Sequence, residues 1–200
     1  MFELSGYQLS DFLLFSPRVY FRLFALHNEA VWPLHILMIV LGLGLCFVLL
    51  SRNMQVGRFV PGTLGIIWIW VGWSFFTLRY ATINPFAIYV APFFALEGAL
   101  LIWIAMRGNG PEFQSVRNMT GIGAMGVLVF SIAGYPFIAP AMMRSLHTAE
   151  VFGIAPDPTA IATLAVLALS RGSLRIMAML IPAAWCGITA LTLWAMHAAS

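Results

Sequence analysis

Hydrophobic residues come in long runs along this chain, and polar residues are confined to the short stretches between them. Five runs reach the ~20 residues that a helix needs to cross a bilayer. They cover residues 31–50, 60–78, 85–106, 120–142 and 175–196. A sixth run, residues 158–170, spans roughly 20 Å at ~1.5 Å per residue, less than the ~30 Å hydrocarbon core. The pattern predicts an all-α bundle of six transmembrane helices.

The stretch ahead of the short run, residues 151–155, is apolar enough to enter a membrane. Gly153, Pro156 and Pro158 would each break a helix there. Non-helical backbone survives at membrane depth only where protein or water satisfies its amides. We therefore expect this stretch to line a cavity.

The residues before the first long run predict an amphipathic helix that is too charged to cross. Ser16 and Pro17 have the order of an N-cap and a first helical residue. Arg18 and Arg22 share one face, and apolar residues recur at helical spacing on another: Val19, Leu23 and Leu26. The prediction is an interfacial segment over residues 1–29 and a six-helix bundle over residues 30–200, in a single integral membrane domain.

Composition supports a membrane protein and excludes several functions. The chain is 62% hydrophobic and only 8% charged, whereas roughly a quarter of the residues of soluble domains are charged. All ten basic residues are arginines, so no lysine can form a Schiff base. The arginines flank apolar runs and form no basic tract, which argues against nucleic-acid binding. The lipid bilayer is the expected partner.

The loop arginines predict the orientation of the bundle. With six crossings, one side carries six of them: Arg52, Arg58, Arg107, Arg117, Arg171 and Arg175. The other side carries Arg18, Arg22, Arg79 and Arg144. Because arginine favours the cytoplasmic side, both termini are predicted outside the cytoplasm. All four histidines and five of the seven acids then face the outer side, so chemistry is expected there.

Three charged residues are candidates for binding at the outer mouth of the predicted cavity. Asp157, between two prolines, either caps the short helix or, with Glu150, binds a cation or proton. Arg79 ends the run 60–78 on the same side, where it either pairs with Glu150 or Asp157 or reaches to the interface alone.

Glu97 is the one acid placed deep within a long run. An ionised carboxylate there costs ~2.5 kcal/mol or more, so it is neutral or paired inside the bundle. It is either a protonated, hydrogen-bonded structural group or part of a proton or cation relay. Alanines at 87, 91, 95 and 99 form a small-residue ladder on another face. We therefore expect the helix to be contacted on two faces.

The histidines give no metal signature. His35 is a binding candidate on the outer side together with His147, but no two histidines have the three- or four-residue spacing of a helical metal pair. Haem ligation by His35 with His147 or His197 is sterically feasible, and nothing selects it, so the cofactor stays unknown. No nucleophile, base and orienting group occur together, which favours a non-enzymatic role.

Three strings carry a family resemblance: DFLLFSPRVYFRLFALHN at 11–28, RYATINP at 79–85 and EVFGIAPDPTAIATL at 150–164. They resemble a family of small bacterial inner-membrane proteins classed as a domain of unknown function. The resemblance implies a multi-pass protein of the bacterial inner membrane, with no established activity to carry over.

Two functions follow from these observations. The first is binding or transport of a small solute or ion at an outer-side cavity. The second is an accessory subunit that packs against other membrane subunits or against copies of itself.

Overall fold

The computed structural model describes residues 15–51, 57–107, 112–113, 116–172 and 174–198. Within these ranges the chain is helical, and its only extended pairing is an isolated bridge between Phe113 and Ser170. The first elements are α1 (Pro17–Val31), α2 (Leu34–Ser51), α4 (Phe59–Val71), η3 (Gly72–Thr77), η4 (Tyr80–Thr82) and α5 (Ala87–Met106). The remaining ones are α6 (Met119–Val129), η5 (Phe130–Gly134), η6 (Tyr135–Phe137), α7 (Ile138–Ala141), η7 (Leu146–Thr148), α8 (Pro156–Leu169) and α9 (Leu174–Ala198).

Five helical segments have the length and hydrophobicity to cross a membrane, which confirms the five long runs predicted from the sequence. They are Leu34–Ser51, Phe59–Thr82, Ala87–Met106, Met119–Ala141 and Leu174–His197. Two of them contain a π-helical segment, η3 after α4 and η5 after α6. Such segments widen a helix locally and often mark functional sites.

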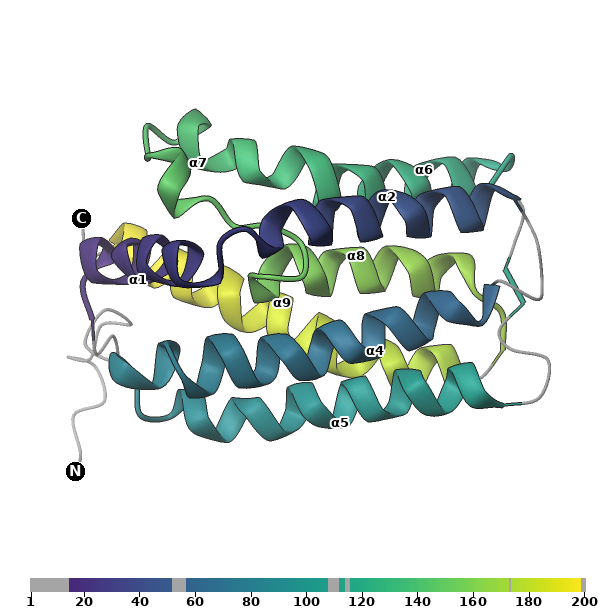
Figure 1. The fold of residues 1–200 in the computed structure, drawn as a ribbon, viewed down its shortest axis with the longest axis horizontal. Helices are drawn as coiled ribbons and strands as arrows, with labels where there is room; N and C mark the ends of the chain where they lie inside the picture. Colours follow the sequence, from purple (N-terminus) through teal and green to yellow (C-terminus); the bar gives the residue numbers. More distant parts are fainter. Residues whose placement is uncertain (1–14, 52–56, 108–111, 114–115, 173, 199–200) are drawn as a thin grey trace, which may run out of the picture.

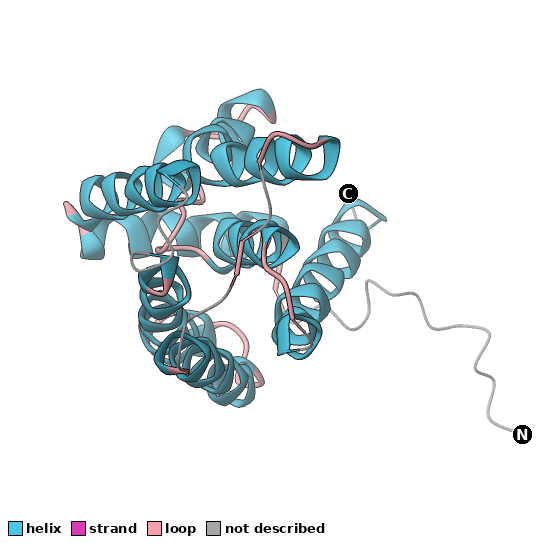
Figure 2. Ribbon diagram, turned by 90° about the vertical axis from the view of Figure 1, so that its right-hand side faces the viewer, coloured by secondary structure: helices cyan, strands magenta, loops and turns pink. Residues whose placement is uncertain are grey.

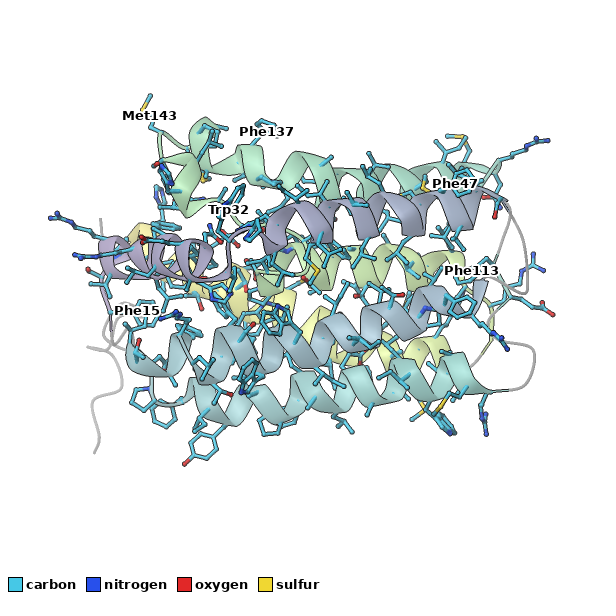
Figure 3. All side chains as sticks on the ribbon, viewed as in Figure 1. Phe15, Trp32, Phe47, Phe113, Phe137 and Met143 are labelled. Atoms are coloured by element: carbon cyan, nitrogen blue, oxygen red, sulfur yellow. The ribbon has the colours of Figure 1, made fainter. Side chains whose placement is uncertain are left out.

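The helices lie side by side in one elongated bundle (Figure 1). α1, α7 and the last turns of α9 lie at one end, here called the α7 end, on the left of Figure 1. The other end is called the Phe113 end after a residue labelled in Figure 3, which also shows the nitrogen atoms of long side chains gathered at both ends. Figure 2 looks onto the Phe113 end, with α8 in the middle of the other helices.

α8 is the central helix of the bundle. Eleven of its fourteen residues are buried, compared with five of the eighteen in the peripheral helix α2. It begins part-way along the bundle and runs to the Phe113 end (Figure 1). Its start at Pro156 and end at Leu169 lie close to the predicted limits of the sixth, short run.

α4 and α5 form the closest helix pair. A Cβ on Gly65 would lie 2.5 Å from the Gly98 carbonyl oxygen, and a Cβ on Gly98 would lie equally close to the Gly65 oxygen. Only glycine permits this approach, which is how small residues bring membrane helices together. The predicted alanine ladder packs only in its first half: Ala87 is buried and Ala91 packs against the core, whereas Ala95 and Ala99 are exposed.

α1 begins as predicted but buries a different face. Ser16 is the N-cap, its hydroxyl accepting from the Val19 amide, and Pro17 is the first helical residue. The buried residues are Tyr20, Leu23, Phe24 and His27, whereas the predicted apolar positions Val19 and Leu26 are 42% and 49% exposed. The face with the aromatic side chains is buried because these side chains have packing partners: Phe24 packs against Phe75 of η3, with ring centroids 5.2 Å apart.

Candidate functional site

Residues 149–155, here called the arm, connect η7 to α8 through the interior of the bundle. All seven are buried. The sequence predicted that residues 151–155 line a cavity, and of these Val151 lines the groove described below. Gly153 has a φ of +75°, a left-handed conformation that glycine adopts without strain. A Cβ on it would lie 2.6 Å from the sulfur of Met38. Only glycine therefore fits this bend.

Several backbone groups of the arm find hydrogen-bond partners within the protein. The Gly153 amide donates to the Thr159 hydroxyl, which in turn donates to the Ala155 carbonyl. The amides of Ile154 and Ala155 both donate to the Val151 carbonyl. At the start of the arm, the Asn28 side chain donates to the Ala149 carbonyl at 2.8 Å. These bonds are what non-helical backbone requires inside a membrane protein.

Asp157 lies in the first turn of α8, where the arm ends, and is 5% exposed. Its Oδ1 accepts two hydrogen bonds from α9, from the Trp185 indole N–H at 2.7 Å and the Thr189 hydroxyl at 2.8 Å. The predicted capping role is wrong: Ala155 is the N-cap, and it makes no side-chain bond. Because α8 begins at Pro156, Asp157 is the second residue of the helix. Its side chain points away from the α8 backbone and contacts α9.

Glu150, 9% exposed, lies against Asp157. The two carboxyl groups are within hydrogen-bonding range of each other. Because an ionised carboxylate can only accept, a hydrogen bond between them requires a proton on one of the two. The Glu150 oxygen Oε2 receives no donor from the described part of the chain. The Tyr135 hydroxyl of η6 is also within hydrogen-bonding range of Asp157.

The arginine beside the pair is Arg144, whose charge acts on Glu150. Its guanidinium carbon lies 3.9 Å from the centre of the Phe21 ring of α1. Among the described residues Arg79 pairs with neither Glu150 nor Asp157; it lies near His27 instead. The arginine whose charge acts on Glu150 is thus Arg144, from the loop after α7, rather than Arg79; the Nε and Nη1 atoms of Arg144 have no hydrogen-bond partner among the described residues.

Aromatic side chains pack around the Glu150–Asp157 pair on its side towards the centre of the bundle. The Trp185 ring lies 4.9 Å from Phe76 and 5.5 Å from Phe94. Phe94 in turn packs on Trp68 at 4.4 Å, and the Trp68 indole donates to the Thr163 hydroxyl of α8 at 2.8 Å. This packed layer separates the carboxyl pair from the Phe113 end.

His35 and His147 line a groove of about 770 Å³ at the α7 end, between α1, α2 and the start of the arm. Trp32, labelled in Figure 3, lies at the turn between the two helices and also lines it. Ala149 and Val151 line the groove, but Glu150 and Asp157 do not. Both acids, which the sequence placed at a cavity mouth, are buried and do not belong to this groove.

Glu97 is fully buried on the inner face of α5, at 0% exposure. Neither carboxylate oxygen has a hydrogen-bond partner among the described residues. The structure does not bring it into contact with Glu150 or Asp157. The hydrogen bonds predicted for a structural glutamate are not found in the described chain.

His27 was not singled out from the sequence, yet it is 1% exposed against the arm. Its ring packs on Phe75 at 5.4 Å. Burial lowers the pKa of His27 to about 4, against the effect of a hydrogen bond to the Ile154 backbone, and Arg79 and His35 lower it further. The imidazole is therefore neutral at physiological pH.

Trp185, Thr189, Tyr135 and Arg144 were also missed as site residues. One signal was present: Trp185 and Thr189 are four residues apart and so share a face of α9. A tryptophan in mid-span needs an acceptor for its N–H. The acceptor itself could not be identified from spacing.

The described residues contain no group of three or more histidine, cysteine, aspartate or glutamate side chains able to hold a metal ion. Neither a curated protein nor a solved structure matches the chain. A family model does, over residues 17–198, which include the arm and every candidate site residue. The chain therefore belongs to the family of unknown function DUF6064.

Proposed function

We propose that this protein crosses the bacterial inner membrane six times and binds a proton at the Glu150–Asp157 pair, as one step in moving a small solute or ion. One observation carries the proposal: two buried carboxyl groups lie within hydrogen-bonding range of each other inside the bundle. Two adjacent carboxyl groups in a water-poor site cannot both ionise, so such pairs take up and release one proton. In this proposal the proton lies in a hydrogen bond between the two groups.

Glu150 is the member of the pair that takes the proton. Asp157 accepts bonds from Trp185 and Thr189, and it lies at the N-terminus of α8, where the helix dipole favours a negative charge. Both effects favour ionised Asp157. Glu150 has an oxygen that receives no donor from the described residues, so we place the proton on Glu150, which then donates a hydrogen bond to the Asp157 carboxylate.

In this proposal the arm and α8 together form the sixth crossing. The fourteen residues of α8 span roughly 21 Å at ~1.5 Å per residue, so the arm has to cover only the remaining ~9 Å of a ~30 Å hydrocarbon core. Transporters commonly place binding sites where a broken helix begins inside the membrane, and Glu150 and Asp157 lie at such a point.

The α7 end faces outwards in this proposal, and α1 lies in the interfacial layer there. Support comes from the arginines of the described chain. The Phe113 end carries five, Arg58, Arg107, Arg117, Arg171 and Arg175, and the α7 end carries four. A fluorescent protein that matures only in the cytoplasm, fused after α9, should stay dark; bright fluorescence would reverse the orientation.

Proton movement tests the proposal directly. The protein would be reconstituted into liposomes that contain a pH-sensitive dye, and a potassium gradient with valinomycin would drive protons inwards. We expect faster acidification than in empty liposomes, and a return to the empty rate in Glu150→Gln. Glu29→Gln, an exposed acid of α1, is the matched control and should retain the wild-type rate.

An acidification rate equal to that of empty liposomes would contradict the proposal. So would a Glu150→Gln variant that conducts like the wild type. Tryptophan-fluorescence unfolding of each variant in detergent shows that any loss of rate arises in folded protein.

A further inference from the structure

A second groove, about 350 Å³ in volume, opens at the Phe113 end between α4, α5, α8 and α9. Its floor is apolar and includes Ile104, Val166 and Leu167, all of which are buried. Its rim carries Arg107, Arg171, Arg175 and Glu112. The groove is therefore apolar inside and basic at its edge.

Backbone contacts hold the rim in place. The bridge between Phe113 and Ser170 ties the linker before α6 to the turn after α8. Beside this bridge, the Arg171 amide donates to the Glu112 carbonyl at 2.8 Å. Two segments that are far apart in the sequence are thus fixed to each other at the groove. Phe113 itself lines the groove and is labelled at this end in Figure 3.

Two of the arginines are also positioned by named contacts. Arg175 donates from Nη1 to the Ser170 carbonyl at 2.9 Å, which leaves the other N–H groups of its guanidinium for a ligand. The Arg107 guanidinium stacks over the Trp103 ring at 4.2 Å. Both side chains are therefore held at the rim by bonds that do not neutralise their charge.

Charge selects an anion as the ligand. Three guanidinium groups and one carboxylate give the rim a net charge of two positive units. α9 begins beside it at Leu174, and the first amides of a helix have no partners within that helix and favour negative charge. Guanidinium groups match the oxygens of phosphate in geometry as well as charge.

We propose that this groove binds the phosphate headgroup of an anionic phospholipid from the leaflet at the Phe113 end. The apolar floor favours a lipid over free phosphate, because a hydrated ion gains nothing from buried isoleucine, valine and leucine side chains. Basic pockets between membrane helices on the cytoplasmic side bind such headgroups. The inference rests on the proposed membrane crossing and orientation, and it is independent of proton binding by Glu150.

The test uses the whole chain, purified in a mild non-ionic detergent. A short-chain phosphatidylglycerol is titrated in, and thermal unfolding is followed by tryptophan fluorescence. Phosphatidylcholine with the same chains and inorganic phosphate are run in parallel. We expect phosphatidylglycerol alone to raise the unfolding temperature, since a ligand that binds only the folded state stabilises it.

Substitutions locate the site. Replacing Arg171 and Arg175 together by glutamine should weaken phosphatidylglycerol binding about tenfold or more, the effect of losing at least one charge-assisted hydrogen bond. Arg58→Gln is the matched control: Arg58 lies at the same end and stacks on Phe59, but does not line the groove. It should bind like the wild type.

Three results would overturn the inference. Equal stabilisation by phosphatidylcholine would show detergent-like binding without headgroup recognition. An equal shift with inorganic phosphate would make the groove a site for a free anion. Equal losses in Arg58→Gln and in the double variant would assign the effect to general surface charge.

Discussion

The two hydrogen bonds from α9 to Asp157 make a quantitative prediction about stability. Asp157→Ala leaves the Trp185 N–H and the Thr189 O–H buried without an acceptor, and each such group costs about 1–3 kcal/mol. We therefore expect a loss of about 2–6 kcal/mol in the free energy of unfolding. Asp157→Asn keeps an oxygen acceptor, so its cost should be about 1–2 kcal/mol. Denaturant unfolding in detergent micelles, followed by tryptophan fluorescence, measures both.

A double-mutant cycle shows whether the loss arises from these bonds. Thr189→Val in the wild type removes a hydrogen bond to a buried carboxyl group and should cost about 1.5–3 kcal/mol. In the Asp157→Ala background it removes a hydroxyl that already lacks its acceptor and should be close to neutral. Their difference is the coupling energy. Equal costs of Thr189→Val in the two backgrounds, or equal costs of Asp157→Ala and Asp157→Asn, would refute the reasoning.

Three further predictions concern the arm and the packing of the helices. His27 has a pKa of about 4 when folded and about 6.5 when unfolded, so the unfolded state binds more protons between these values. Stability should therefore fall as pH drops from 6.5 to 4, by about 3 kcal/mol, and His27→Leu should remove this part of the pH dependence of unfolding. Gly98→Ala should lower the unfolding temperature because its Cβ would lie 2.5 Å from the Gly65 carbonyl oxygen. Gly123→Ala, with nothing within 4 Å, should raise stability by up to ~1 kcal/mol; equal effects of the two alanines would contradict the close approach. Asn28→Ala removes the donor to the Ala149 carbonyl at the start of the arm and should speed amide hydrogen exchange in residues 149–155. Unchanged exchange would show that this hydrogen bond does not hold the arm in place.

Hydrophobic runs were sufficient to place the long helices. Their position along the chain depends on local composition, and a membrane-length run has few alternatives to a helix. The start of α1 was equally predictable, since Ser16 and Pro17 carry a local signal. The burial of the arm followed from an apolar stretch that contains Gly153.

Which side chains meet across helices was not predictable from periodicity. Asp157 looked like a cap, because a carboxylate beside a proline at a helix start usually is one. Its partners, Trp185 and Thr189, lie on another helix, and their approach depends on how α8 and α9 are rotated against each other. The choice between Arg79 and Arg144 was unpredictable for the same reason. Both arginines lie at the α7 end, and the path of the chain after α7 decides that the charge of Arg144 acts on Glu150.

The central claim is that the Glu150–Asp157 pair holds one proton, on Glu150. Infrared difference spectroscopy of the carboxyl C=O stretch, recorded on the reconstituted protein at neutral pH, tests it most directly. The account predicts a protonated-carboxyl band that is absent from Glu150→Gln and retained in Glu29→Gln. A Glu150→Gln spectrum with the same protonated-carboxyl bands as the wild type would contradict it.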